Sequence, residues 1–264
     1  MRVKICFRPE KEVEIIDINY NYYITSMIYN LLSKSNKEFT DKLHDEGYRL
    51  GSRHFKLFTF SQLKVKKYIV EESKIKIMDD ALLYIGSPRL DFLYYLSDTL
   101  LKAERIKIGS GFFIVDHVDL LRNVRFSREE RFYCLSPITT STMEVIGNVK
   151  KERNVDIRDS KFIDNLKNNL IRKYYLLYDR LPEDMNIDIH FDEEYLSNIR
   201  GKLIWFKNVA VKGYSAPFTI KADPEIIKVA YECGLGDKNS AGFGMIEIDR
   251  KNRVGLDNVC DSGV

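Results

Sequence analysis

The sequence predicts an α+β protein made of two tandem ferredoxin-like domains, a fold that RNA-recognition modules also use. Its first half reads β-α-β-β-α-β with one extra helix, and the same order recurs in the second half. A length of 264 residues with 44% hydrophobic residues suits two medium-sized domains. We expect domains over residues 1–122 and 123–250, followed by a polar tail over 251–264.

The first domain opens with a strand in which Val3, Ile5 and Phe7 alternate with more polar residues, the two-residue period of a half-buried strand. Helical spacing of apolar residues then predicts a helix over 22–33. A second helix over 37–46 has Asn36 as its N-cap and ends at a glycine. The remaining elements expected in this half are strands at 55–61, 64–71 and 74–78, a helix at 89–104 and a strand at 112–118.

The second domain repeats this order of elements without repeating the residues themselves. Phe162, Leu166, Leu170 and Tyr174 mark the buried face of a long helix over 160–179. The other elements expected here are strands at 131–137, 186–191, 202–211 and 218–222, a helix at 224–233 and a last strand at 243–248. The polar, arginine-rich stretch 122–130 is the expected joint between the domains.

Composition bounds the function only loosely. The net charge is +3, so the positions of basic residues say more about a nucleic-acid partner than their sum does. The four cysteines lie far apart with no C-x-x-C pair, which predicts free thiols in a reducing compartment and no zinc site. No apolar run is long enough for a membrane helix and the N-terminus has no signal stretch, so we expect a cytoplasmic protein without membrane contact.

A glycine-rich run, GLGDKNSAGFGM over 234–245, is the most distinctive segment. Glycine lets backbone N–H groups approach a phosphate closely. The run follows a predicted helix, unlike a Rossmann turn, and it has no G-K-S/T as in a nucleotide-binding P-loop. A turn in which Gly234 ends the helix is an equally good interpretation. If the run holds RNA, its candidate contacts are Gly234, Gly236, Lys238, Ser240, Gly242 and Gly244.

The extended run GLGDKNSAGFGMIEI resembles the C-terminal signature of the CRISPR-associated endoribonucleases that cut precursor CRISPR RNA within its repeats. The opening strand MRVKICF, the segment KLHDEGYRLGSRHFKLFTFSQL and the segment SPITTST resemble the same family. These segments span nearly the whole chain in the right order. The resemblance implies two ferredoxin-like domains, a glycine-rich loop that helps hold RNA, CRISPR repeat RNA as partner, and cleavage without a metal ion or other cofactor.

The resemblance also implies the catalytic residues. A histidine and a tyrosine near the first helix usually carry the chemistry in this family, which here implies His44 as general acid/base and Tyr29 in support. Without the resemblance, His44 reads as a helix-terminal histidine favoured by the helix dipole, and Tyr29 as a half-buried surface tyrosine. Histidine suits proton transfer because its ordinary pKa lies near 6.5.

The family often places a lysine a few residues after its histidine, and this sequence departs from that pattern. Arg49, Arg53 and Lys56 all follow within reach, and none aligns cleanly. A guanidinium could stabilise the phosphorane through two hydrogen bonds. His54, in the same loop, is a minor alternative to His44, while the other two histidines, His117 and His190, read as structural.

Basic clusters supply further candidate RNA contacts, although charge runs are usually solvated surface. Besides Lys56, they lie near the hairpin of the first domain and in a predicted loop of the second: Lys64, Lys66, Lys150, Lys151 and Arg153. A non-catalytic RNA-binding subunit of the same fold is the main alternative, and a small-molecule enzyme or interaction domain is a third. Membership of a CRISPR effector complex and pairing as a homodimer both stay open.

Overall fold

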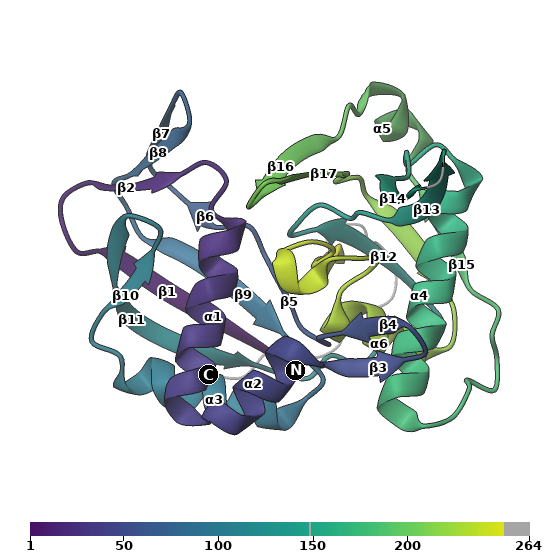
Figure 1. The fold of residues 1–264 in the computed structure, drawn as a ribbon, viewed down its shortest axis with the longest axis horizontal. Helices are drawn as coiled ribbons and strands as arrows, with labels where there is room; N and C mark the ends of the chain where they lie inside the picture. Colours follow the sequence, from purple (N-terminus) through teal and green to yellow (C-terminus); the bar gives the residue numbers. More distant parts are fainter. Residues whose placement is uncertain (148, 251–264) are drawn as a thin grey trace, which may run out of the picture.

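The computed structural model describes residues 1–147 and 149–250, which form two α+β halves packed side by side (Figure 1). The expected polar tail, 251–264, lies outside the described residues. Strand β11 ends at Leu121 and strand β12 begins at Glu129, so the expected joint at 122–130 falls largely on the segment that connects the two halves. Within the described ranges, no helix is both long and apolar enough to cross a membrane.

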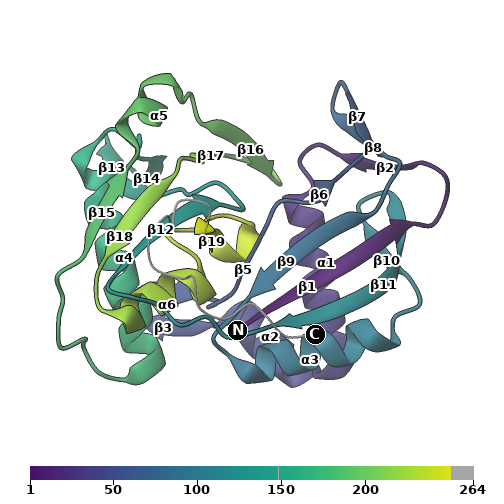
Figure 2. The ribbon, with the colours of Figure 1, turned by 180° about the vertical axis from the view of Figure 1, so that it is seen from behind.

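The N-terminal half is built on an antiparallel sheet with the order β10-β11-β1-β9-β5, in which β6 also pairs with β9. Its strands are β1 (Arg2–Pro9), β5 (Thr59–Phe60), β6 (Lys64–Val65), β9 (Ala81–Gly86), β10 (Ile106–Ile108) and β11 (Gly111–Leu121). Its helices are α1 (Asn21–Ser35), α2 (Lys37–Asp45) and α3 (Leu90–Lys102), which cover one face of the sheet (Figure 2). Val3, Ile5 and Phe7 are buried on that face, as their alternation predicts.

The predicted helices of this half are confirmed. Ile24, Ile28 and Leu32 are fully buried on α1. The Asn36 side chain caps α2 by accepting a hydrogen bond of 2.9 Å from the backbone N–H of Phe39. Gly47 follows this helix in the left-handed region with φ +63°, as expected of a residue that ends a helix.

The strands assigned to the β-α-β-β-α-β order of this half are wrong in one respect. The strands expected at 64–71 and 74–78 are mainly β7 (Tyr68–Glu71) and β8 (Lys74–Ile77), which form a separate sheet with β2 (Glu14–Asp17). The neighbour of β1 is instead β9, which the sequence analysis missed. Because β9 is largely buried on both faces, its apolar residues do not alternate clearly with polar ones.

A smaller error concerns the strand expected at 55–61. It is split between β4 (Arg53–Phe55), which forms a hairpin with β3 (Tyr48–Leu50), and β5. Leu57 lies between the two strands at a positive φ of 52°, a conformation that breaks an extended segment. The hairpin carries residues 48–55 away from the sheet and toward helix α4 of the other half.

The C-terminal half has an antiparallel sheet with the order β15-β18-β12-β19. Its strands are β12 (Glu129–Cys134), β15 (Asp188–Phe191), β18 (Phe218–Lys221) and β19 (Ile246–Ile248), and its main helices are α4 (Ser160–Tyr178) and α6 (Pro224–Cys233). Numbered along each β-α-β-β-α-β order, both sheets place the fourth, first, third and second strands side by side. The expected α+β class with repeated element order is therefore observed.

Two hairpins and two short helices complete this half: β13 (Ser141–Ile146) with β14 (Val149–Asn154), β16 (Lys202–Phe206) with β17 (Val209–Gly213), α5 (Glu193–Asn198) and the 3₁₀ helix η1 (Asn239–Ala241). The single strand expected at 202–211 is thus a hairpin outside the main sheet. The predicted loop carrying Lys150, Lys151 and Arg153 is also wrong, since these residues lie on β14. Side chains of β14 are almost all exposed, so no apolar alternation marks it as a strand.

The two halves are locked together by a buried arginine. The Arg2 side chain is 1% exposed and donates to the backbone oxygens of Tyr231 and Ile246 at 2.5 and 2.6 Å. It also pairs with Glu247 at 3.0 Å and lies 3.2 Å above the centre of the Tyr231 ring. Because both terminal nitrogens of its guanidinium meet acceptors of the C-terminal half, this arginine sets how β1 sits against α6 and β19.

Candidate active site

The structure brings the two main catalytic candidates into contact. Tyr29 lies on α1 and His44 lies in the last turn of α2, and their ring centres are 5.1 Å apart with an edge-to-face angle of 83°. The Tyr29 ring also contacts Phe58, whose ring centre is 6.0 Å away. Asn36 links the two helices and lets them pack side by side, which makes the ring pair possible.

The two rings meet different environments. The His44 side chain is 65% exposed, and its Nδ1 lies 2.8 Å from the Asp45 carboxylate. Tyr29 is half-buried, and burial raises the pKa of its hydroxyl above the ordinary value. The phenol therefore keeps its proton near neutral pH and can donate a hydrogen bond, while the imidazole has the solvent access that proton exchange needs.

Lys56 connects the β3–β4 hairpin to the His44 segment. Its Nζ donates to the backbone oxygens of Leu43 and His44, both at 2.6 Å, and so occupies the negative end of the α2 dipole. Burial lowers the pKa of this ammonium. Gly47 passes so close that a Cβ there would lie 3.1 Å from the Lys56 Nζ and would overlap the backbone oxygen of Phe55.

The other basic candidates are held differently. Arg49, on β3, donates from Nε to the backbone oxygen of Gly51 at 3.0 Å, within its own hairpin. Arg53, on β4, lines a cavity between the two halves. The His54 Nδ1 lies 2.7 Å from the backbone oxygen of Glu46. Lys56 is thus the candidate cation that the structure ties to the backbone of His44.

The cavity between the halves has a volume of about 290 Å³. The N-terminal half contributes residues 53–58 to its wall, and Lys56 among them also contacts the His44 backbone. The C-terminal half contributes residues of α4 and of the glycine-rich loop, residues 234–245. Four basic residues of the two halves, Arg53, Lys56, Lys173 and Lys238, line this cavity together with one acidic residue, Asp237. Their positive charges suit a phosphodiester chain.

Sequence reasoning missed Lys173. This α4 residue is 2% exposed, and its Nζ donates to the backbone oxygens of Gly234 and Gly236 at 2.7 and 3.0 Å and to Asn239 Oδ1 at 2.6 Å. Burial lowers its pKa to about 8. A signal existed, because Lys173 follows Leu170 by three residues and so interrupts the apolar stripe of the predicted helix.

Of the two interpretations of the glycine-rich loop, the packed turn agrees better with the structure than a row of outward N–H groups. Its four glycines at 234, 236, 242 and 244 are buried with positive φ angles. A Cβ at Gly236 would overlap the backbone oxygen of Thr139, and one at Gly242 would overlap the Phe60 ring. Gly242 therefore serves close packing between the halves, and Gly236 serves close packing within the C-terminal half. Lys238 and Ser240, at the tip of the loop, do line the cavity.

The N-terminal half grips this loop through its carbonyl groups. The Asn21 side chain donates to Ala241 at 2.9 Å, and the Thr25 hydroxyl donates to Ser240 at 2.9 Å. Both donors lie on α1, the helix that also carries Tyr29. Helix α1 thus both carries Tyr29 and holds the glycine-rich loop.

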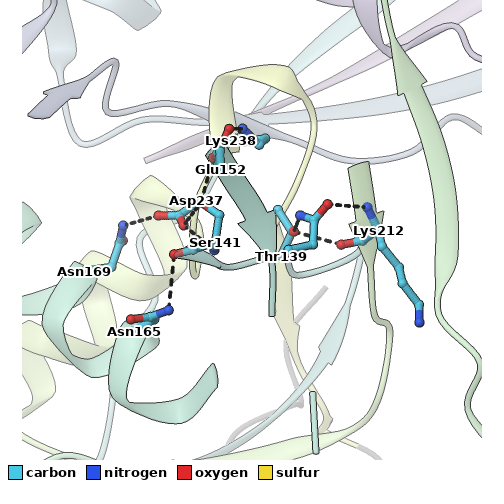
Figure 3. Close-up of polar contacts among 9 residues, drawn as sticks. Thr139, Ser141, Glu152, Asn165, Asn169, Lys212, Asp237 and Lys238 are labelled. Atoms are coloured by element: carbon cyan, nitrogen blue, oxygen red, sulfur yellow. Dashed lines mark hydrogen bonds and ion pairs between the residues drawn. The ribbon is translucent and has the colours of Figure 1, made fainter. Parts of the chain in front are cut away.

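A polar network holds the other side of the loop (Figure 3). Asp237 accepts hydrogen bonds from the Ser141 backbone N–H at 2.9 Å and from the Asn169 side chain at 3.0 Å. Lys238 pairs with Glu152 at 2.9 Å. Burial opposes ionisation of Glu152, but hydrogen bonds from Ser141 and Lys238 hold its pKa below the ordinary value. Ser141 belongs to the SPITTST segment, so two segments singled out in the sequence contact each other.

Comparison with known proteins identifies the family. Residues 15–119 match the family described as CRISPR-associated protein Cas6, N-terminal, and residues 121–248 match CRISPR associated protein Cas6, C-terminal. CRISPR-associated endoribonuclease Cas6 1 of Methanocaldococcus jannaschii is 32% identical over 256 residues, which cover 96% of this chain and 95% of that protein. The chain belongs to the Cas6 family. The resemblance noted in the sequence is thereby confirmed at the level of the family.

Solved structures agree with this Cas6 assignment. The product of a Cas6-related gene from Pyrococcus furiosus has a TM-score of 0.83 and 28% identity, covering 95% of this chain and 99% of that chain. A structure described as a RAMP protein binding different RNA substrates has a TM-score of 0.82 and 26% identity, covering 94% and 99%. Both the α+β fold and the pairing of two Cas6 domains are therefore shared.

The remaining RNA-contact candidates of this Cas6 chain lie outside the cavity. Lys64 and Lys66 line a second pocket of about 600 Å³, together with Lys202 of the other half. Lys150, Lys151 and Arg153 are exposed on β14, where Arg153 pairs with Glu144 at 3.0 Å. The structure thus separates the predicted contacts into three groups: the residues lining the cavity, Lys64 with Lys66, and the basic residues of β14. The cavity group is linked to the Tyr29–His44 pair through Lys56, which contacts the His44 backbone.

Proposed function

We propose that this Cas6 chain is an endoribonuclease that cuts CRISPR repeat RNA without a metal ion. The 2′-oxygen next to the scissile phosphate forms a bond to phosphorus, and the bond from phosphorus to the 5′-oxygen breaks. The products are a 2′,3′-cyclic phosphate and a 5′-hydroxyl. The observation that supports this proposal is the contact between the Tyr29 and His44 rings beside Lys56, which also lines the cavity between the halves.

Each of the three side chains has a role that fits its environment. The exposed imidazole of His44 exchanges protons with the reacting oxygens. Tyr29 keeps its proton, because burial raises its pKa, and so donates a hydrogen bond that positions the phosphate or the leaving oxygen. Lys56 supplies the positive charge that stabilises the phosphorane, in place of Arg49 or Arg53.

The rest of the molecule holds the RNA. Each half is a ferredoxin-like domain in this proposal. Arg53 and Lys238, which line the cavity, contact phosphates of the RNA. Lys64, Lys66 and the basic residues of β14 extend the contact surface. Because such binding releases counterions, affinity should fall steeply as salt rises.

A non-catalytic RNA-binding Cas6 subunit is the second candidate. It is favoured by the absence of a lysine at the usual spacing after His44 and by the similar RAMP structure, whose description names RNA binding alone. In this case the chain would bind repeat RNA and leave it intact, with the Tyr29–His44 pair serving only as packing.

The deciding experiment incubates the purified chain with the repeat RNA of its own CRISPR array, in the presence of excess chelator. A second substrate carries a 2′-deoxy substitution at the scissile nucleotide. We expect cutting of the first RNA and none of the second. Loss of cutting on chelation would exclude the metal-independent route, and binding without any cutting would support the second candidate.

A matched pair of variants tests the site. His44→Ala should lower the single-turnover cleavage rate about 10²–10⁴-fold, the range for loss of an acid/base group, while RNA affinity changes little. His190→Ala, an exposed histidine on β15, is the control and should cleave like the unmodified chain. Equal rates for both variants would remove His44 from the mechanism.

A further inference from the structure

A second cluster of chemically reactive side chains lies on the N-terminal sheet, apart from the candidate active site. It contains Cys6 of β1 and the consecutive residues Asp116 and His117 of β11. One ligand atom from each residue, the sulfur, a carboxylate oxygen and a ring nitrogen, lies within 4.8 Å of the other two. Helices α1 and α2 cover the face with Ile5 and Phe7, so Cys6, which alternates with them, lies on the opposite face.

A β-bulge creates this cluster. Cys6 pairs with His117, but the next residue, Phe7, pairs with Val115, which leaves Asp116 as an extra residue in β11. Consecutive residues of a regular strand point to opposite faces, whereas a bulge lets two of them oppose one residue of the partner strand. The bulge therefore places Asp116 and His117 together against Cys6. The alternation of residues along β11 does not predict this arrangement.

Carboxylates lie next to the cluster, while Lys64, Lys66 and Lys202 line the wider pocket that contains Cys6. The Asp116 carboxylate lies within 4.8 Å of the Cys6 sulfur, and Asp80 lines the same pocket as Cys6. The His117 Nδ1 lies 2.7 Å from Asp116, and its Nε2 lies 3.7 Å from Asp119. Lys4 pairs with Asp119 at 2.6 Å and is the cation in contact with that carboxylate. Bound metal would offset the negative charge of Asp116 and of the Cys6 thiolate.

We propose that Cys6, Asp116 and His117 bind one divalent cation of the zinc class. Thiolate sulfur, imidazole nitrogen and carboxylate oxygen are the ligands that zinc takes in proteins, at bond lengths of about 2.0–2.3 Å. Such bonds put ligand atoms about 3.3–3.8 Å apart in a tetrahedron. Asp116 and His117 are about half exposed, so their side chains can turn to close the remaining gap.

Binding of the metal ion releases one proton from the protein. The Cys6 thiol loses its proton to solvent as the sulfur bonds to the metal, and the neutral imidazole donates its lone pair. Asp80, which lines the same pocket as Cys6, or a water molecule can complete the coordination. The bound ion would tie β1 to β11 on the face away from Tyr29 and His44, so it has no part in the proposed cleavage. Its effect would be structural.

Cobalt(II) is the probe, because a cobalt–thiolate bond absorbs in the near ultraviolet. The full-length chain, without a histidine tag, is stripped with chelator and titrated. We expect one equivalent to bind with a thiolate absorption band, and zinc to displace it. Cys6→Ser should abolish the band, and His117→Ala should weaken binding at least about tenfold, the lower range seen when groups around a metal are changed. His117 is exposed, so this second variant does not threaten folding.

Two other thiols provide controls. Cys134→Ser removes a thiol of the C-terminal half, and Cys260→Ser removes one beyond the described residues. Both should bind cobalt like the unmodified chain. A band that survives Cys6→Ser, a band lost in either control, or no band at all would overturn the proposal. Zinc should also raise the melting temperature of the unmodified chain more than that of His117→Ala at the same zinc concentration.

Discussion

The Lys173 ammonium lies 2.6 Å from the Asn239 side-chain oxygen, and through this contact helix α4 holds the tip of the glycine-rich loop. The same ammonium binds two backbone oxygens of the loop, at Gly234 and Gly236. A buried charge is stable only when hydrogen bonds replace its water shell, and here three acceptors do so. The Lys173 ammonium on α4 therefore holds one side of the loop, and Asn21 and Thr25 of α1 hold another.

Replacing Lys173 tests this support. Lys173→Met keeps most of the volume but leaves acceptors in the loop without a donor, which costs roughly 1–3 kcal/mol per unsatisfied group. We expect a lower free energy of unfolding in urea and a slower cleavage rate, because the loop lines the cavity. Lys161→Met, on the exposed side of the same helix, is the control and should change stability by less than about 0.5 kcal/mol. Equal stabilities would show that the ammonium does not hold the loop.

The same residue predicts a dependence of stability on pH. Burial lowers the pKa of Lys173 to about 8, from an ordinary value of 10.5. Between these pH values the unfolded chain binds more protons than the folded one, so the contribution of this site to stability rises with pH. Urea unfolding of the unmodified chain and of Lys173→Met should therefore diverge as pH increases from 8 to 10.5. A constant difference would mean that Lys173 titrates normally.

The hydroxyl of Tyr29 can be removed without disturbing its ring. Tyr29→Phe keeps the edge-to-face contact with His44 and loses only the proton donor. Single-turnover cleavage should slow about 10²-fold, the lower end for an acid/base contact, with RNA affinity and stability nearly unchanged. Tyr23→Phe, on the exposed side of α1, should cleave normally. An unaltered rate for Tyr29→Phe would restrict this residue to packing.

Lys56 and Arg49 are separated by a direct comparison of alanine variants. Lys56→Ala removes the cation bound to the backbone of His44 and should lower the cleavage rate about 10²–10³-fold at saturating protein. Arg49→Ala removes a side chain that bonds within its own hairpin and should stay within about threefold of the unmodified rate, near experimental equivalence. The reverse order of effects would assign the third catalytic role to Arg49.

Alanine variants at Gly236 and Gly51 separate the effect of close packing on stability from that of backbone strain. Both have positive φ, so alanine costs roughly 1–2 kcal/mol at either position. Only at Gly236 would the added Cβ meet other atoms, among them the Thr139 oxygen, which adds about 1–3 kcal/mol of overpacking. Urea unfolding should therefore show Gly236→Ala as the less stable variant. Similar stabilities would mean that the loop has room to move.

Local patterns in the sequence determined much of this protein. Apolar periodicity located α1 and α4, end signals located α2, the order of elements indicated two α+β halves, and short segments such as GLGDKNSAGFGMIEI carried the family resemblance. The pairing of Tyr29 with His44 followed from the same resemblance. Helix periodicity and family segments are written in neighbouring residues, so a single sequence suffices to find them.

Only the tertiary structure decided the contacts between distant segments. It placed β9 beside β1, turned the loop glycines inward, brought Lys173 beneath them and set Cys6 against the bulge at Asp116 and His117. It also tied Lys56 to the backbone of His44. Strand pairing, close packing and buried hydrogen bonds depend on which remote surfaces meet, and local propensity does not contain that information.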